Sequence, residues 1–169
     1  MKFPQDDFFD VLDANHKFVN SFEHSDLTGT ARKGLAIVTC MDSRINPLAV
    51  VGMQAGDAKI LRNAGARVTD DVLRTLVLAS YLLGVTRVLV MPHTDCRMVC
   101  ESDSVIHQTI QSQYAVDTRS LEFCTVSDQH EALALDTDRI RSYPLLQKGV
   151  TVAGAIYNVS TGKLEPVDC

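Results

Sequence analysis

The stretch from residue 35 to residue 44 reads Leu-Ala-Ile-Val-Thr-Cys-Met-Asp-Ser-Arg, and it joins an apolar run to a group of reactive side chains. The apolar residues follow one another without the alternation of a half-exposed strand. Such a continuous run is typical of a parallel strand covered on both faces. We therefore predict a buried strand over 34–39, with Cys40, Asp42 and Arg44 directly after it.

A second apolar run, Val88 to Met91, is followed by His93 and Cys96. We predict that this run is also a strand, over 87–91. The carboxyl ends of neighbouring parallel strands meet at one edge of a sheet, where ligands bind in open α/β folds. We therefore expect Cys40, His93 and Cys96 to lie close together.

Two thiolates and an imidazole are a zinc ligand set, and three protein ligands leave the fourth position open, as catalytic zinc requires. In an extended segment, Asp42 and Arg44 would point to the same side as Cys40, so that Arg44 can pair bidentately with Asp42 and hold it ionised. A helix starting at His93 would bring that residue and Cys96 onto one face.

Other interpretations of the same residues remain open. A buried cysteine is usually a small apolar residue, and a histidine is usually a satisfied polar group. Two motifs, each after its own strand, favour a metal site instead. A closed structural site would take Cys100 as a fourth ligand. Asp95 is either a partner of a ligand or a turn former, and we favour the turn.

The remaining pattern alternates helices and strands, which predicts a mostly parallel β-sheet flanked by helices, an α/β fold. We expect a loop over 23–33, and His107 and the other histidines apart from His93 in solvent. The further expected elements are helices over 46–53, 70–83 with Thr69 as cap, 101–114 and 127–141 with Ser127 as cap, and strands over 58–62, 150–159 and 164–167.

Residues 6–22 predict an amphipathic helix with an apolar, largely aromatic face. This helix precedes the first strand, so we expect an N-terminal arm over 1–24 that extends onto a partner subunit. The helix over 70–83 is apolar nearly all round. A helix of this kind is buried, so we expect it to lie between the sheet and another subunit.

The composition is that of a soluble globular chain, with 169 residues, 46% hydrophobic content and a formal charge of −5. We expect one domain over 1–169. The basic residues are scattered, which gives no support for a nucleic-acid or membrane surface. Neither a signal peptide nor a membrane span is expected. Five cysteines without a disulfide spacing pattern indicate reduced thiols in the cytoplasm.

The motifs at 40–44, 56–65 and 93–96 resemble those of the β-class carbonic anhydrases, and the short chain is similar to the compact members of that family. The resemblance implies a homodimer or higher homo-oligomer that hydrates carbon dioxide reversibly to bicarbonate, by attack of zinc-bound hydroxide. It implies zinc ligands at Cys40, His93 and Cys96 and a catalytic pair at Asp42 and Arg44. Because two thiolates cancel the charge of the ion, we expect activity to rise into alkaline pH.

The sequence departs from the family where glycine usually follows the second cysteine, because Arg97 stands there. This cation narrows the pocket mouth, attracts bicarbonate or points into solvent. Related members of the fold hydrolyse carbonyl sulfide or carbon disulfide, so these linear substrates are the alternative. A non-catalytic, zinc-stabilised binding module is the third interpretation, and the intact pair of Asp42 and Arg44 argues against it.

Overall fold

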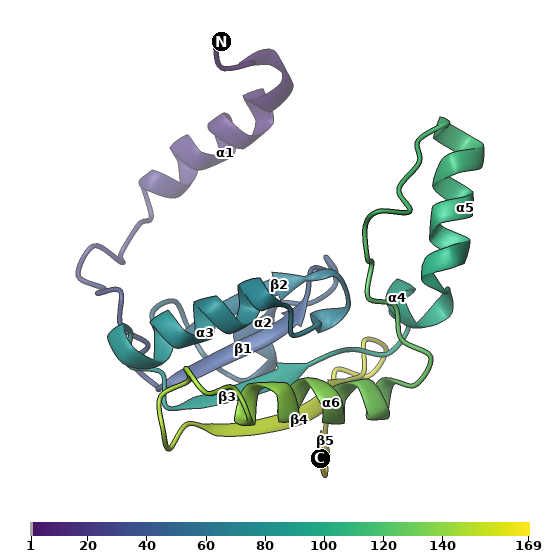
Figure 1. Ribbon diagram of the computed structural model, residues 1–169. Coiled ribbons are helices and arrows are strands. Elements are labelled where there is room, and N and C mark those ends of the chain that lie inside the picture. Colours follow the sequence, from purple (N-terminus) through teal and green to yellow (C-terminus); the bar gives the residue numbers. More distant parts are fainter. Residues whose placement is uncertain (1) are drawn as a thin grey trace.

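A computed structural model describes residues 2–169, and its centre is a five-stranded β-sheet in the order β2-β1-β3-β4-β5 (Figure 1). The first four strands are parallel, whereas β5 runs antiparallel to β4. The predicted α/β class is therefore confirmed. The strands are β1 (Leu35–Cys40), β2 (Ala58–Asn63), β3 (Arg87–Met91), β4 (Thr151–Tyr157) and β5 (Leu164–Val167).

Strand β1 is an interior strand between β2 and β3, and all six of its residues are buried. This burial explains why its apolar residues are continuous rather than alternating. In the parallel register, Thr39 faces Met91 of β3, and Cys40 faces Asn63 of β2. The carboxyl ends of these strands therefore lie together at one edge of the sheet.

Helices α3 (Asp70–Leu82) and α6 (Gln129–Arg141) cover one face of the sheet (Figure 1). They enclose the larger apolar core, which includes Leu76, Leu133 and Ile140. The smaller core contains Ile37, Met91, Cys40, Cys96, Ile45 and Met98, together with residues of the short helices α2 (Pro47–Val50) and α4 (Arg97–Cys100). Two of the candidate ligands, Cys40 and Cys96, are therefore part of a packed apolar core.

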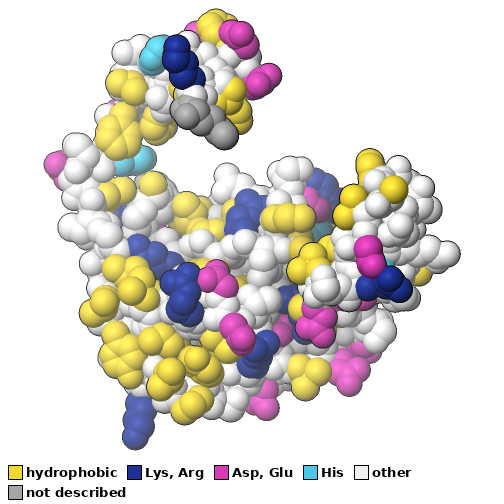
Figure 2. All heavy atoms as spheres, turned by 45° about the horizontal axis from the view of Figure 1, so that its top comes forward, with side chains coloured by type: hydrophobic (Ala, Val, Ile, Leu, Met, Phe, Trp, Pro, Cys, Tyr) yellow, Lys and Arg dark blue, Asp and Glu magenta, His cyan; other side chains and the backbone are white. Residues whose placement is uncertain are grey.

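Helix α3 is buried on one side only in the single chain, and the expected cover of its other side by a second subunit remains a prediction. Leu73 and Leu76 lie in the core, whereas Leu78, Tyr81 and Leu82 are at least half exposed. Figure 2 shows apolar side chains gathered on this part of the surface. Thr69 occupies the predicted N-cap position, but its side chain makes no capping hydrogen bond.

The N-terminal segment forms a 3-10 turn, η1 (Asp6–Phe8), and helix α1 (Phe9–Val19), which stands away from the sheet (Figure 1). Its large apolar side chains, including Phe9 and Phe18, are exposed in the single chain. The helix is therefore where the pattern placed it. Its extension onto a partner subunit remains a prediction.

Helix α6 begins at Gln129, two residues later than predicted. The N-cap is Asp128 rather than Ser127, because the Asp128 carboxylate accepts hydrogen bonds from the backbone N–H groups of His130 and Glu131. Asp128, one residue after the expected cap, is the N-cap because its carboxylate oxygen reaches two backbone N–H groups that have no partner within the helix.

Helix α5 (Asp103–Tyr114) and the chain that follows it project from the body as a hairpin (Figure 1). Asp103 fastens this hairpin, since its carboxylate accepts hydrogen bonds from the backbone of Phe123 and from both the backbone and the hydroxyl of Thr125. His107 is half-buried rather than solvent-facing, because its ring packs on Phe123 and bonds Thr118. Within residues 2–169, no helix is long and apolar enough to cross a bilayer.

Candidate metal centre

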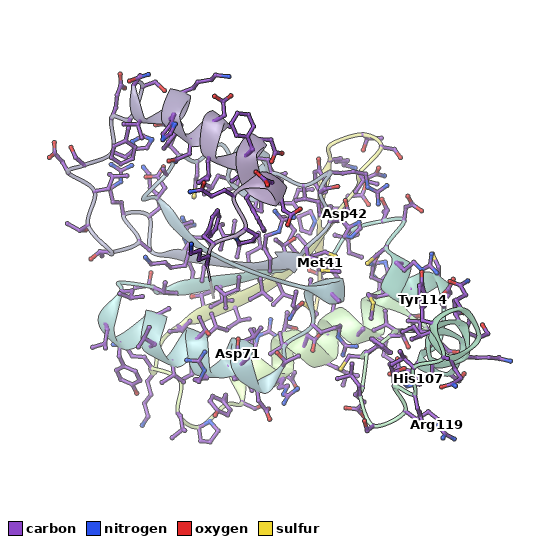
Figure 3. The ribbon with its side chains drawn as sticks, turned by 90° about the horizontal axis from the view of Figure 1, so that it is seen from above. Met41, Asp42, Asp71, His107, Tyr114 and Arg119 are labelled. Carbon is purple, nitrogen blue, oxygen red and sulfur yellow. The ribbon has the colours of Figure 1, made fainter. Side chains whose placement is uncertain are left out.

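Cys40, His93 and Cys96 converge at the carboxyl ends of β1 and β3. One ligand atom of each lies within 4.8 Å of the others, and this group can hold a metal ion. The two sulfur atoms are 4.0 Å apart. All three residues are buried, His93 with only 1% of its surface exposed. Figure 3 shows Met41 and Asp42 at this end of the sheet, toward α5.

A loop brings His93 and Cys96 together, so the helix considered as one way to align them does not form. Helix α4 starts only at Arg97, with Cys96 as its N-cap residue. Asp95 between the two ligands has a left-handed backbone, with φ of 56°. His93 continues the parallel pairing of the sheet through a bridge to Tyr157, which fixes the start of the loop.

His93 is arranged so that its Nε2 lone pair is free to bind a metal ion. Its Nδ1 donates a hydrogen bond of 2.8 Å to the carbonyl of Thr94, which leaves Nε2 as the unprotonated nitrogen. Among the described residues, this buried Nε2 has no hydrogen-bond partner. A buried nitrogen without a partner is costly, and a metal ion held by two sulfur atoms beside it would satisfy it. The side chains present therefore fit a zinc ion.

The two thiols share their protons unequally. The Cys96 thiol beside the Cys40 sulfur lowers the pKa of Cys40 most, burial opposes this shift, and the nearby His93 ring lowers the pKa further. The same contact raises the pKa of Cys96, because a second thiolate beside the first is unfavourable. Burial alone would lower the pKa of His93, yet the neighbouring Cys40 sulfur and the hydrogen bond to Thr94 raise it. A bound cation would relieve the repulsion between two thiolates.

Asp42 and Arg44 form the bidentate pair that the sequence predicts, with Nε to Oδ1 at 3.0 Å and Nη2 to Oδ2 at 2.7 Å. The segment is a turn rather than extended, because the backbone N–H of Arg44 also donates to Asp42 Oδ1. These hydrogen bonds hold the pKa of Asp42 well below its usual range. Asp42 Oδ2 lies 3.7 Å from His93 Nε2, beside the ligand group.

Two further residues at this edge make contacts that the sequence did not predict. Arg62 of β2 donates hydrogen bonds to the carbonyl oxygens of Cys40, Asp42 and Ile45, which holds the turn after β1. Asp95 forms the expected turn and also accepts a hydrogen bond of 2.7 Å from Arg44 Nη1. The spacing of the sequence gives no sign of either contact, since both depend on how two loops fold toward each other.

The outer residues of α4 lie away from the ligand group. The Cys100 thiol donates to the carbonyl of Cys96, and in the part of the chain described here Cys100 does not join the metal-binding group. The closed four-ligand site is therefore not formed. Arg97 is exposed and pairs with Glu101, so it takes the solvent-facing position among the three that were expected.

Comparison with known proteins agrees with this geometry. The family model described as carbonic anhydrase matches residues 35–164. β-Carbonic anhydrase 1 of Mycobacterium tuberculosis is 34% identical over 94% of this chain and 96% of its own length. A carbon disulfide hydrolase of Acidithiobacillus thiooxidans is 28% identical over 78% of this chain and 76% of its own.

Among solved structures, the carbonic anhydrase of Streptococcus mutans superposes with a TM-score of 0.89 and 35% identity. That match covers 99% of this chain and 100% of the other. The strand order, the ligand group and the sequence therefore lead to the same result. The chain belongs to the β-class carbonic anhydrase family.

Proposed function

We propose that this protein is a zinc-dependent carbonic anhydrase that interconverts carbon dioxide and bicarbonate. The observation that carries the proposal is the buried, unpartnered Nε2 of His93 between two thiols, with the Asp42 carboxylate 3.7 Å away. Cys40, His93 and Cys96 would hold the ion. A zinc ion bound there supplies Lewis acidity, which makes water a nucleophile near neutral pH.

Asp42 would orient the attacking water through a hydrogen bond accepted by its carboxylate. Because Arg44 keeps the pKa of Asp42 low, this group stays an acceptor throughout the neutral range. Arg44 also binds both Asp42 oxygens, which favours the orientation that keeps the carboxylate beside the ligand group rather than on the ion. Arg44 thus acts on the reaction through Asp42.

A second candidate function is hydrolysis of carbonyl sulfide or carbon disulfide at the same site. The support for this function is that several proteins named carbon disulfide hydrolase are 28% to 30% identical to this chain. These substrates are linear and uncharged, like carbon dioxide. The same nucleophile would attack all three, so the choice depends on the path to the site.

We infer that the working unit is a homodimer or a higher homo-oligomer. Helix α1 exposes apolar side chains such as Phe9 and Phe18, and α3 exposes Tyr81 and Leu82. Exposed apolar side chains gathered on two helices favour association with a second copy. We place the protein in the cytoplasm, where thiolates that bind zinc stay reduced.

The test is stopped-flow hydration of carbon dioxide by the zinc-loaded protein at about pH 8.5, where a charge-neutral zinc site is active. Fast turnover that chelation abolishes and zinc restores supports the proposal. A protein that binds one zinc per chain but does not hydrate carbon dioxide contradicts it. Hydrogen sulfide release from carbonyl sulfide or carbon disulfide would then assign the second function.

A further inference from the structure

Arg44 binds two carboxylates from different loops. Its Nε and Nη2 face Asp42, whereas Nη1 donates to Asp95 Oδ2 at 2.7 Å and Nη2 also donates to the Asp95 carbonyl at 3.0 Å. Asp42 follows Cys40 at the end of β1, and Asp95 lies between the other two candidate ligands. The guanidinium group therefore joins the two ligand-bearing loops.

A second Asp-x-Arg sequence in the chain shows that the pair itself needs no third residue. Asp117 and Arg119 make the same contacts, with Nε to Oδ1 at 3.0 Å, Nη2 to Oδ2 at 2.7 Å and the Arg119 N–H on Oδ1. Across residues 2–169, Asp117 is the sole hydrogen-bond partner of the Arg119 side chain. Asp95 is thus unnecessary for pairing Arg44 with Asp42.

What Asp95 adds is a connection between that pair and the loop of His93 and Cys96. Asp42 Oδ2 lies 3.7 Å from His93 Nε2. Because the two residues are on different loops, this distance depends on contacts between the loops. The Asp95 carboxylate is largely exposed, yet its oxygen and its carbonyl both aim at one guanidinium group. Asp95 has a left-handed backbone at φ of 56°, which aspartate tolerates better than most residues, so the turn itself does not require its contact with Arg44.

We propose that Asp95 is a positioning residue, which holds Arg44 and thereby sets Asp42 against the metal-binding group. This inference rests on the proposed function, in which Asp42 orients the attacking water. A shift of about 1 Å in a positioned group can reduce a rate about a hundredfold. The role is separate from metal binding, because Asp95 does not contribute to the ligand group.

The test uses Asp95→Gly, which removes the carboxylate and retains the left-handed backbone without strain. We expect kcat to fall by roughly 10-fold to 100-fold with one zinc still bound per chain, since the ligands remain. Asp95→Asn is expected to retain most activity, because its amide oxygen can accept the same hydrogen bond. The control is Asp70→Ala, which removes another exposed carboxylate from an arginine, Arg139, on the far helices.

Two further measurements separate positioning from a general structural effect. In the Arg44→Ala background, Asp95→Gly should cause no additional loss of kcat, because the two residues act as a unit. Hydrogen–deuterium exchange of the metal-free protein should show faster exchange over 93–96 in Asp95→Gly and unchanged exchange in Asp70→Ala. This second readout does not depend on turnover or on bound zinc.

The outcomes distinguish this inference from the proposed function. Near-wild-type kcat for Asp95→Gly, beside a large loss for Arg44→Ala, overturns the role of Asp95 and leaves the function intact. Losses that multiply in the double variant also overturn it, because Asp95 would then act independently of Arg44. Wild-type kcat for Arg44→Ala overturns the inference about Asp95 and the role given to Arg44, while carbon dioxide hydration itself still stands.

Discussion

At the scale of single residues, the pairing of Arg44 with Asp42 depends on a planar group that offers two parallel donors. Arg44→Lys retains the positive charge but cannot reproduce the fork, so Asp42 loses its fixed orientation. We expect kcat to fall by roughly 10-fold to 100-fold while zinc content stays at the wild-type level. Stopped-flow hydration and metal analysis check this result.

The matched control for that substitution is Arg119→Lys, which alters the same kind of pair on the exposed hairpin. It should leave turnover unchanged. Equal losses in Arg44→Lys and Arg119→Lys would show that the rate responds to general destabilisation and not to the orientation of Asp42.

The lowered pKa of Asp103 predicts that the stability of the protein depends on pH. Hydrogen bonds from the Thr125 hydroxyl, and then from backbone N–H groups, lower the pKa of Asp103 from 3.8 to about 2. A lowered pKa stabilises the folded state above about pH 4, and this contribution is lost as the pH falls toward 2. Asp103→Asn should therefore be less stable than wild type at neutral pH, by a difference that shrinks in acid.

Urea unfolding from about pH 7 down to about pH 3, followed by circular dichroism, measures that difference. A gap between wild type and Asp103→Asn that stays constant over this range would contradict the assignment. Because Asp103 lies on the hairpin, hydrogen exchange of Phe123 and Thr125 should report the same loss locally.

The sequence predicted much of the candidate site at this scale, because Cys40, Asp42 and Arg44 are near neighbours whose spacing limits their geometry. It gave Asp95 a turn but not its contact with Arg44, and it gave Arg62 no role. Each residue makes its contact with a segment that is distant in the chain. The pattern of residue types along the sequence does not show that the two segments are close in space. His107 was placed wrongly for the same reason, since Phe123 and Thr118 reach it from the returning loop.

At the scale of elements, β4 and α6 pack so closely that only glycine fits at position 154. A Cβ there would lie 2.9 Å from Leu133 Cγ and 3.0 Å from the sulfur of Cys169. Gly154→Ala should therefore lower the free energy of unfolding by about 1–3 kcal/mol through overpacking. Gly29→Ala is the control, because nothing lies within 4 Å of a Cβ at that position.

Thermal or urea unfolding of both variants decides this prediction. Equal stability of Gly154→Ala and wild type would mean that Leu133 and the C-terminal residue move aside without cost. A similar loss in Gly29→Ala would show that the effect comes from the backbone of glycine and not from the contact with α6.

The strands were predicted to within a residue or two at most ends because buried parallel strands have a simple signal, a continuous apolar run. Helix starts were less accurate. Ser127 and Asp128 are both good caps by composition, and only the folded backbone shows which one reaches the free N–H groups of α6. The spacing of three between His93 and Cys96 is compatible with a helix start and with a loop, and the structure shows a loop that ends where α4 begins.

At the scale of the whole molecule, the exposed apolar faces of α1 and α3 predict an oligomer. Replacing Phe18 and Leu82 together with aspartate places charges on both faces. We expect sedimentation velocity to show a dimer for wild type and a monomer for the double variant at micromolar concentration. Lys17→Glu, a charge change on the same helix, should leave the dimer intact.

A wild-type protein that sediments as a monomer would contradict the assembly. A double variant that remains a dimer would place the interface elsewhere. The sequence indicated this surface through a helix, α3, that carries more apolar residues than one chain covers. It could not show which of those residues stay uncovered, because that depends on the side of α3 that meets the sheet.

The parallel pairing of β1 with β3 also has a consequence for the order of events during folding. Cys40 and Cys96 lie 56 residues apart in the chain and meet only when these strands are in register. Contacts of such separation form late, after the entropy of closing the intervening loop has been overcome. During refolding, high-affinity capture of the ion must therefore follow the pairing of β1 with β3, and its rate reports the completion of the central sheet.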